Sequence, residues 1–431
     1  MHLLTRIKQL GQSKFARNVA IVATGTAGAQ AITMAFAPLI TRLYGPEAFG
    51  LLGIYMAIIT VLMPVAALTY PIAIVLAKTD ADAKGIAKLS AILALSIAVM
   101  TSVLLLVAGD WIAEALSMQA VAGFMLLIPV AMLFAAFQQI FLQWLVRKKQ
   151  FSTTARVAVM QALISNSAKA GVGLVHPVGA ALIIIAAVAQ GFHAALLWLG
   201  IRYSKNKKAL PQADQPTETI RELARRHRDF PAYRAPQVAL NAFTQGLPVL
   251  VLASFFGPAA AGFFALTRSV LAAPAALIGQ SVGSVFYPKA VDLYDKPAEL
   301  KRVLLKATYS LIALGGLVFA PILIAGPWLF SLVFGSEWKE AGEFARWVTI
   351  WMVLSLAARP VISAIPVLGL QKTFLVFEII FLPLKFLSLY LGVFLDEPAI
   401  SVALYSVISS AFYVLLFLLV CKKIAGLLSK A

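Results

Sequence analysis

The composition of this 431-residue chain excludes an ordinary soluble protein. Hydrophobic residue types make up 61% of it and charged residues 13%, against about 45–50% and about 25% in soluble domains. The apolar residues form long continuous runs, whereas the strands of a membrane barrel would be short and alternating. The chain is therefore predicted to be an all-α polytopic membrane protein. Its net charge of +18 is attributed to membrane topology and not to a nucleic-acid partner.

Twelve apolar runs are long enough to cross a bilayer, which takes about 20 residues. Six lie in each half of the chain, so we expect two six-helix lobes. The second run contains Pro64 and Pro71 and is long enough to be tilted or kinked. The runs are predicted at residues 18–41, 49–77, 89–109, 121–145, 154–175, 178–200, 237–256, 260–288, 307–330, 343–369, 373–393 and 399–420.

A ten-residue turn motif indicates that the two lobes are related. It reads LYGPEAFGLL at residues 43–52 and FFGPAAAGFF at residues 255–264, with both glycines and the proline in register. Each Gly-Pro step predicts a tight turn, because glycine accepts a positive φ and proline presets its own. A second matching pair reads AGDWI at residues 108–112 and AGPWL at residues 325–329. Six spans per lobe make such repeats parallel, related by an axis along the membrane normal.

Lysine and arginine accumulate in every second connection, which is the pattern that fixes membrane orientation. The connections between them are mostly acidic and hold, for example, Glu47, Asp110 and Asp396. The basic side is expected to face the cytoplasm, and this places both termini there. The basic connections carry Arg6, Lys8, Lys14, Arg17, Lys78, Lys84, Lys88, Arg147, Lys148, Lys149, Lys289, Lys296, Lys301, Arg302, Lys372, Lys422 and Lys423, in addition to the residues of the long central connection.

The longest connection, residues 201–235, is predicted to be a basic cytoplasmic linker. It separates an N-terminal lobe at residues 1–200 from a C-terminal lobe at residues 236–431. Thr219 and Glu222 fit a capping box, which predicts a short helix before the basic run. That run either binds anionic lipid headgroups or is a solvated linker that obeys the positive-inside rule.

Five charged residues lie away from the ends of the predicted spans and are the candidate functional residues. They are Lys169, Arg268, Arg359, Glu378 and Lys385. Each costs about 2.5–3.5 kcal/mol at a helix centre, so it persists only when it is paired or faces water. The helical rise places Arg268, Arg359 and Lys385 about 15–18 Å deep, near the middle of a core about 30 Å thick. Four cations against one carboxylate predict an interior that suits an anion.

Two interpretations of these residues remain open. In the first, Arg268, Arg359 and Lys385 form a clamp for phosphate in a hydrated cavity, since arginine suits bidentate contacts. Lys169, nearer the outer end of its span, is the fourth candidate for this clamp. In the second, Glu378 pairs with Arg359 across helices, while Arg268 and Lys169 snorkel or cap carbonyl ends.

Signals for enzymatic chemistry are absent from the sequence. It has no P-loop, no metal-ligand spacing, no paired aspartates of a sugar-nucleotide site and no candidate catalytic triad. The four histidines are scattered, and His193 in the sixth span either titrates near neutral pH or is packed among apolar residues. The lone Cys421 excludes an intramolecular disulfide. We expect a protein that is not an enzyme and uses no metal or cofactor.

Three segments carry a family resemblance. They read PLITRLYGPEAFG at residues 38–50, YPIAI at residues 70–74, and GPWLF with FGSEW at residues 326–338. In these segments the chain resembles the polysaccharide transporter family, the O-antigen and exopolysaccharide flippases of the multidrug/oligosaccharidyl-lipid/polysaccharide exporter superfamily. The resemblance implies two six-helix lobes around a central cavity. It also implies alternating access that moves a polyprenyl-pyrophosphate-linked oligosaccharide across the bacterial cytoplasmic membrane.

The resemblance further implies partners and a driving force. Membrane lipids and other polysaccharide biosynthesis proteins are the partners expected besides the lipid-linked oligosaccharide itself. Coupling to a proton or sodium gradient is implied as well, and Glu378 is the only carboxylate away from the ends of the predicted spans that could serve it.

Two other functions compete with the flippase. A drug or cation antiporter of the same superfamily would share the fold but would need buried carboxylates for a cationic cargo. A membrane polysaccharide polymerase or ligase would need a large outward loop with arginine or histidine clusters, and the predicted outward loops are short and acidic.

Overall fold

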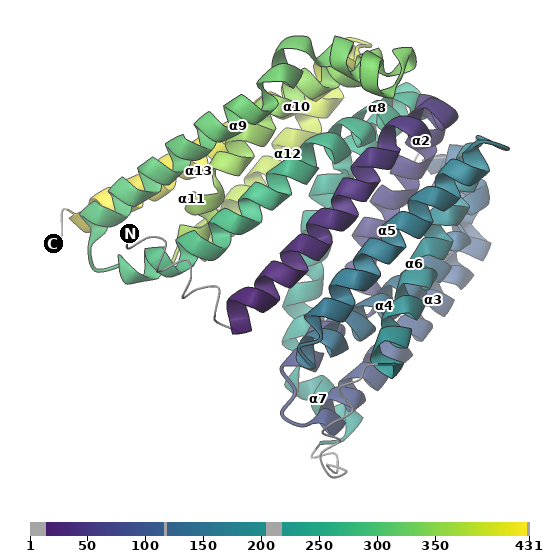
Figure 1. Cartoon of the computed structure of the whole chain (residues 1–431), viewed down its shortest axis with the longest axis horizontal. Coiled ribbons are helices and arrows are strands. Elements are labelled where there is room, and N and C mark those ends of the chain that lie inside the picture. Colours follow the sequence, from purple (N-terminus) through teal and green to yellow (C-terminus); the bar gives the residue numbers. More distant parts are fainter. Residues whose placement is uncertain (1–13, 116–118, 204–217, 429–431) are drawn as a thin grey trace. The chain divides into compact units, whose positions relative to one another are not determined.

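The computed structural model describes residues 14–115, 119–203 and 218–428, and these are almost entirely helical (Figure 1). No strand occurs among them, which confirms an all-α polytopic chain. Most of the basic N-terminal segment and residues 204–217 of the predicted linker lie outside this description. The helices are α2 (Lys14–Ala66), α3 (Asp80–Ala115), α4 (Leu127–Arg147), α5 (Phe151–Gly173), α6 (Gly179–Arg202), α7 (Ile220–Arg226), α8 (Ala235–Asp292), α9 (Pro297–Phe334), α10 (Lys339–Ala357), α11 (Arg359–Ala364), α12 (Gln371–Phe394) and α13 (Pro398–Leu428). Between them lie the short 3-10 helices η1 (Tyr70–Val75), η2 (Gln119–Phe124) and η4 (Ser336–Trp338) and the short π-helix η3 (Phe230–Arg234).

Helices α2 and α8 each contain two predicted spans that meet at a glycine. Gly45 has φ 68° and ψ 174°, and Gly257 has φ 84° and ψ 175°. This region of backbone space is essentially restricted to glycine. The two copies of the turn motif therefore share one backbone conformation, as the repeat predicted. With these two breaks counted, the long helices correspond to the twelve predicted spans, α10 and α11 together forming the tenth.

Two predicted spans are shorter than the apolar runs that suggested them. The run 49–77 leaves the α-helix at Ala66, and Leu68 and Thr69 take a positive φ before η1 begins. The run 343–369 is divided, because α10 ends at Ala357 and α11 continues only to Ala364. Apolar residues in these turns are as favourable in a membrane as helical ones, so hydropathy alone does not mark where the helix stops.

Nine helices of the described residues are long and apolar enough to cross a membrane, the two spans of α2 and those of α8 being counted together. Helix α5 is not among them, although its 23 residues extend about 35 Å at the usual rise. Its polar content, and not its length, sets it apart.

The chain divides into two compact units. The first runs to Tyr44 and then from Leu51 to Leu247, and the second consists of Gly45–Gly50 and the chain from Pro248 onward. In the first unit α4 packs against α3 and α6, and α5 packs against α6. In the second unit α10 packs against α9 and α13, and α12 packs against α13.

Within the second unit, the two copies of the turn motif pack on each other through their second glycines. A Cβ atom at Gly50 would lie 1.7 Å from the carbonyl oxygen of Pro258, and one at Gly262 would lie 2.1 Å from that of Pro46. Only glycine lets the two backbones come this close. The repeated glycines are thus explained by a reciprocal contact between the repeated segments.

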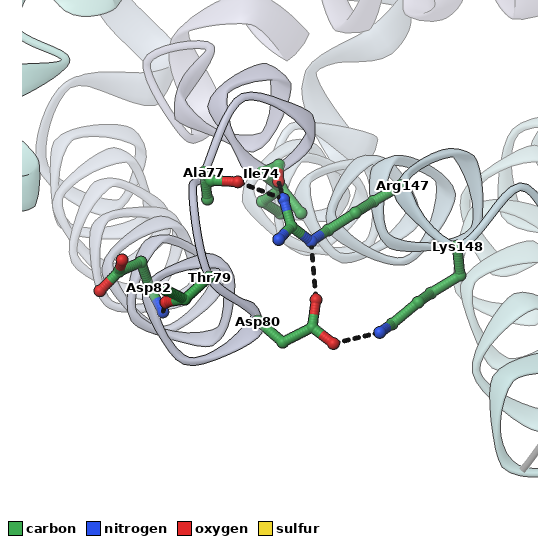
Figure 2. Close-up of polar contacts among 7 residues, drawn as sticks. All are labelled: Ile74, Ala77, Thr79, Asp80, Asp82, Arg147 and Lys148. Atoms are coloured by element: carbon green, nitrogen blue, oxygen red, sulfur yellow. Dashed lines mark hydrogen bonds and ion pairs between the residues drawn. The ribbon is translucent and has the colours of Figure 1, made fainter. Parts of the chain in front are cut away.

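Arg147, the last residue of α4, joins α4 to the start of α3 on the predicted cytoplasmic side (Figure 2). Its Nε donates to Asp80 at 3.0 Å, and one terminal nitrogen donates to the carbonyl oxygens of Ile74 and Ala77 at 3.1 and 2.7 Å. Lys148 forms a second ion pair with Asp80. A single guanidinium therefore holds η1 and the ends of two helices together.

Helix α7 lies against α3 in the first unit. Its predicted capping box is present, with the Thr219 hydroxyl accepting from the Glu222 amide and the Glu222 carboxylate accepting from the Thr219 amide. Leu223 is buried against Gly85 of α3, and the Tyr70 hydroxyl donates to the Ala224 carbonyl at 3.1 Å. This part of the central connection is therefore folded onto the first unit.

A candidate anion site in the first unit

A polar cavity of about 300 Å³ lies among α2, α4, α5 and α6 of the first unit. Its apolar wall comes from residues after the kink of α2 and from two alanines of α6. Its polar wall comes from the three other helices. The lining residues are Leu52, Met56, Met63, Gln138, Gln161, Ser165, Lys169, Ala186, Ala189, Gln190 and His193.

Helix α5 presents three of the polar lining residues as a stripe. Gln161, Ser165 and Lys169 are spaced four residues apart, so they lie on one face of the helix, one turn above another. Sequence reasoning identified Lys169 but missed the two residues below it. The signal that would have found them is this four-residue spacing of polar side chains in a span of a membrane protein.

Lys169 is held in place through its backbone. The Tyr44 hydroxyl donates to the Lys169 carbonyl oxygen at 2.8 Å, and the Tyr44 ring packs where a side chain at Gly173 would have to lie. The residue before the first motif glycine thus fixes α5 next to the first span. The Lys169 ammonium enters none of the ion pairs formed by the described residues.

A second polar pair joins α4 to α6 across the cavity. The Gln138 Nε2 and the His193 Nδ1 lie 3.2 Å apart. An amide nitrogen only donates, so His193 Nδ1 accepts and the neutral ring carries its proton on Nε2. Gln190, one turn before His193 on α6, lines the same cavity. His193 therefore lies in a polar cavity, and the alternative that it is packed only among apolar residues is not what the structure shows.

The cavity contains a cation and no carboxylate among the described residues that line it. Lys169 supplies the formal positive charge, and the amides of Gln138, Gln161 and Gln190 supply neutral hydrogen-bond donors. Oxygen atoms of the amides and of Ser165 can accept bonds from the sugar or hydroxyl portion of a ligand. Chemically, this donor set suits an anion that also carries hydroxyl groups.

The other predicted site residues belong to the second unit, and Lys169 belongs to the first. Among the described residues, no ion pair joins Glu378 to Arg359, so the cross-helix pair considered from sequence does not form. Arg359 begins α11 and is exposed. Its guanidinium passes close to Gly279, where a Cβ would lie 2.9 Å from Nε.

Lys385 and Arg268 of the second unit each interact with an aromatic residue of α13. The Lys385 ammonium lies 4.8 Å from the centre of the Phe412 ring, a cation–π geometry. Arg268 of α8 interacts electrostatically with Tyr405 of α13. Glu378 is on α12 with Lys385, two turns away, and the two interact electrostatically without forming an ion pair. The aromatic neighbours were not foreseen, because each lies on a different helix from the cation.

The fold defines the class of the protein. One solved structure that it matches is an inward-facing multidrug resistance MATE family transporter of the MOP superfamily, at 15% identity and a TM-score of 0.67 over 93% of this chain and 96% of that one. Another is a MOP superfamily transporter from Pyrococcus furiosus, at 15% identity and a TM-score of 0.60 over 97% and 98%. The chain is thus a multi-pass membrane protein with the fold of MOP superfamily transporters.

Its family follows from the sequence. The model of the polysaccharide biosynthesis protein family matches residues 39–343, which is most of the chain, and the protein belongs to that family. This confirms the family that the turn motifs suggested. No curated protein matches the chain by sequence.

Proposed function

We propose that the protein is a flippase for surface polysaccharide biosynthesis. It moves a polyprenyl-pyrophosphate-linked oligosaccharide across the bacterial cytoplasmic membrane by alternating access, with both chain termini in the cytoplasm. Family membership supports a role in polysaccharide biosynthesis, and the MOP fold supports transport as the activity. The protein then acts without enzymatic chemistry of its own, and its partners are the lipid-linked oligosaccharide, membrane lipids and other polysaccharide biosynthesis proteins.

The observation that carries this proposal is the charge balance of the cavity in the first unit. A cargo with a phosphate group needs a cation and hydrogen-bond donors, and Lys169 with three glutamine amides provides both. A cationic drug would need a carboxylate, which is missing from the described lining. In the MOP superfamily transporter from Pyrococcus furiosus, reverse polarity of the binding pocket suggests a different function for that protein.

The size of the cavity limits what it binds. A volume of about 300 Å³ is at the lower end of the range for ligand pockets, about 300–1,000 Å³. It accommodates a phosphate-bearing headgroup and an adjoining sugar but not an entire oligosaccharide. The polyprenyl tail would stay in the bilayer, as its apolar surface requires.

The four remaining candidate residues complete the proposal. Arg268, Arg359 and Lys385 are proposed to meet the pyrophosphate or acidic sugars at another stage of the transport cycle. Glu378 is proposed to bind the coupling ion, because a carboxylate at this depth is costly unless it is used or paired.

The proposal is tested in cells that lack the gene and carry either the wild type or a variant. The measurement is the amount of lipid-linked oligosaccharide retained in the cytoplasmic leaflet, with the membrane abundance of each variant determined in parallel. We expect the deletion to trap the glycolipid. Lys169→Gln, which loses a charged hydrogen bond, should lower the flipping rate about tenfold or more, whereas Lys78→Gln, at an exposed lysine, should not.

The outcomes separate the function from the site. A deletion that traps no glycolipid refutes the flippase. A deletion that traps it, together with full activity of Lys169→Gln at normal abundance, leaves the flippase standing but removes the cavity as its anion site. Arg268→Ala, Arg359→Ala and Lys385→Ala test the second-unit residues by the same measurement.

A further inference from the structure

We propose that the cavity of the first unit binds its anion together with a proton, and that His193 is the group that takes up this proton. The inference rests on the proposed anionic cargo and extends it, because it assigns a proton-binding role to a residue outside the five candidates. It is carried by the position of His193 in the same cavity as Lys169 and by its bond to Gln138.

Few of the residues that line the cavity with His193 can carry a charge. Helix α4 presents the neutral Gln138, α2 presents only apolar residues to the cavity, and α6 itself adds the neutral Gln190. Helix α5 presents Gln161, Ser165 and Lys169. Among the described residues that line the cavity, Lys169 is therefore the one other titratable group.

A bound anion supplies a negative charge to this cavity. With a phosphate or sulfate in the cavity that His193 and Lys169 both line, the imidazolium form of His193 becomes more favourable. Linkage then requires the reverse effect, because a proton on His193 must tighten anion binding by the same factor. The two ligands bind cooperatively, unlike a carboxylate site where a proton and a cationic cargo compete.

The hydrogen bond to Gln138 provides a switch that suits both states. In the neutral ring Nδ1 accepts from the amide nitrogen, and in the imidazolium both ring nitrogens donate. A 180° rotation of the Gln138 amide places its carbonyl oxygen where the nitrogen was, so that it can accept a hydrogen bond from protonated Nδ1. Proton uptake at Nδ1 therefore leaves the pair bonded, and the positive charge is shared over the imidazolium ring of a residue that lines the cavity.

A consequence for transport follows from the shared site. The proton enters with the anion and travels in the same direction, so acid on the loading side promotes loading. At this cavity the proton and the anion are therefore not transported in opposite directions. Coupling to an ion that moves in the opposite direction would require another residue.

The test uses the full-length protein in nanodiscs and sulfate as the probe, because sulfate does not titrate in this pH range. Sulfate affinity is measured between about pH 6 and about pH 8, which brackets ordinary histidine titration. The titration of His193 is followed by NMR of histidine-labelled protein with and without sulfate, and its signal is assigned by its loss in His193→Gln. His176→Gln, at an exposed loop position, is the matched control.

We expect sulfate to bind about tenfold more tightly at the acid end and to raise the His193 titration midpoint by about one pH unit. His193→Gln should bind sulfate weakly and independently of pH, and His176→Gln should behave as wild type. Wild-type binding that depends on Lys169 but leaves the His193 midpoint unchanged overturns the inference and leaves the proposed function intact. Failure of the wild type to bind sulfate, or binding unaffected by Lys169→Gln, overturns the anion site and the inference together.

Discussion

Replacing Gly50 by alanine tests whether the repeated turn motif is held by backbone contact. The added Cβ would lie 1.7 Å from the Pro258 carbonyl oxygen and 2.4 Å from its carbonyl carbon. Nonbonded carbon and oxygen atoms need more than 3 Å, so the two backbones must separate by roughly 1.3 Å. Neither partner is a flexible side chain that could rotate away. Overpacking of this kind costs about 1–3 kcal/mol, and more where backbone has to move.

The expected loss at Gly50 exceeds the gain that alanine normally brings to a helix. Alanine in place of glycine stabilises a helix interior by about 1 kcal/mol, which leaves Gly50→Ala clearly destabilised. The control is Gly316→Ala in α9, where a Cβ meets no atom within 4 Å. Gly316→Ala should be neutral or slightly stabilising, since only the propensity effect remains.

The assay is thermal unfolding of the detergent-solubilised protein, followed by the monomeric fraction on size exclusion after heating. Scan rate is held constant, because unfolding of a large membrane protein is treated as a rate and not as an equilibrium. Gly50→Ala should lower the apparent melting temperature and Gly316→Ala should not. Equal melting temperatures for the two variants would refute the reciprocal contact. Gly262→Ala, opposite the Pro46 carbonyl, should repeat the loss.

Two further predictions concern the predicted cytoplasmic side. Arg147→Gln removes the donor to Asp80 and to two carbonyl oxygens and should lower the stability of the fold by about 1–3 kcal/mol. Lys148→Gln, at a more exposed residue, should lower it by about 1 kcal/mol or less. Equal melting temperatures for the two variants would contradict this. Burial and the neighbouring Arg226 hold the pKa of His227 below its ordinary value, so this residue binds fewer protons in the folded state. Its contribution to stability is therefore present above about pH 6.5 and is lost as the pH falls through the folded pKa. An NMR titration midpoint of His227 at or above the ordinary value would refute this assignment.

The fold was largely readable from the sequence because its signals are local. The glycines of the turn motif predicted a positive φ, and both copies have it. Thr219 and Glu222 predicted a helix start, and their capping box is present. The end of a helix inside an apolar run was not readable, as at Ala66, because the bilayer rewards apolar residues in any backbone conformation whose polar groups are satisfied.

The candidate site was only partly readable. Lys169 stood out as a charge in a span, and its stripe with Gln161 and Ser165 is a local pattern that could have been recognised. The contact between Gln138 and His193 joins residues 55 positions apart on different helices. It depends on how α4 and α6 pack, which no spacing within either helix determines.

The polar face of α5 is itself an argument for function. An apolar stripe at Gln161, Ser165 and Lys169 would insert into a membrane more readily, since a charged residue within a membrane-spanning helix is costly. The bond that positions Lys169 is made by its backbone carbonyl and not by its side chain, and Gln161 and Ser165 line the cavity. We infer that the unfavourable free energy of placing these polar side chains in the membrane is offset by the ligand that the cavity binds. On this reasoning the stripe would disappear from a protein that kept the fold and gave up an anionic cargo.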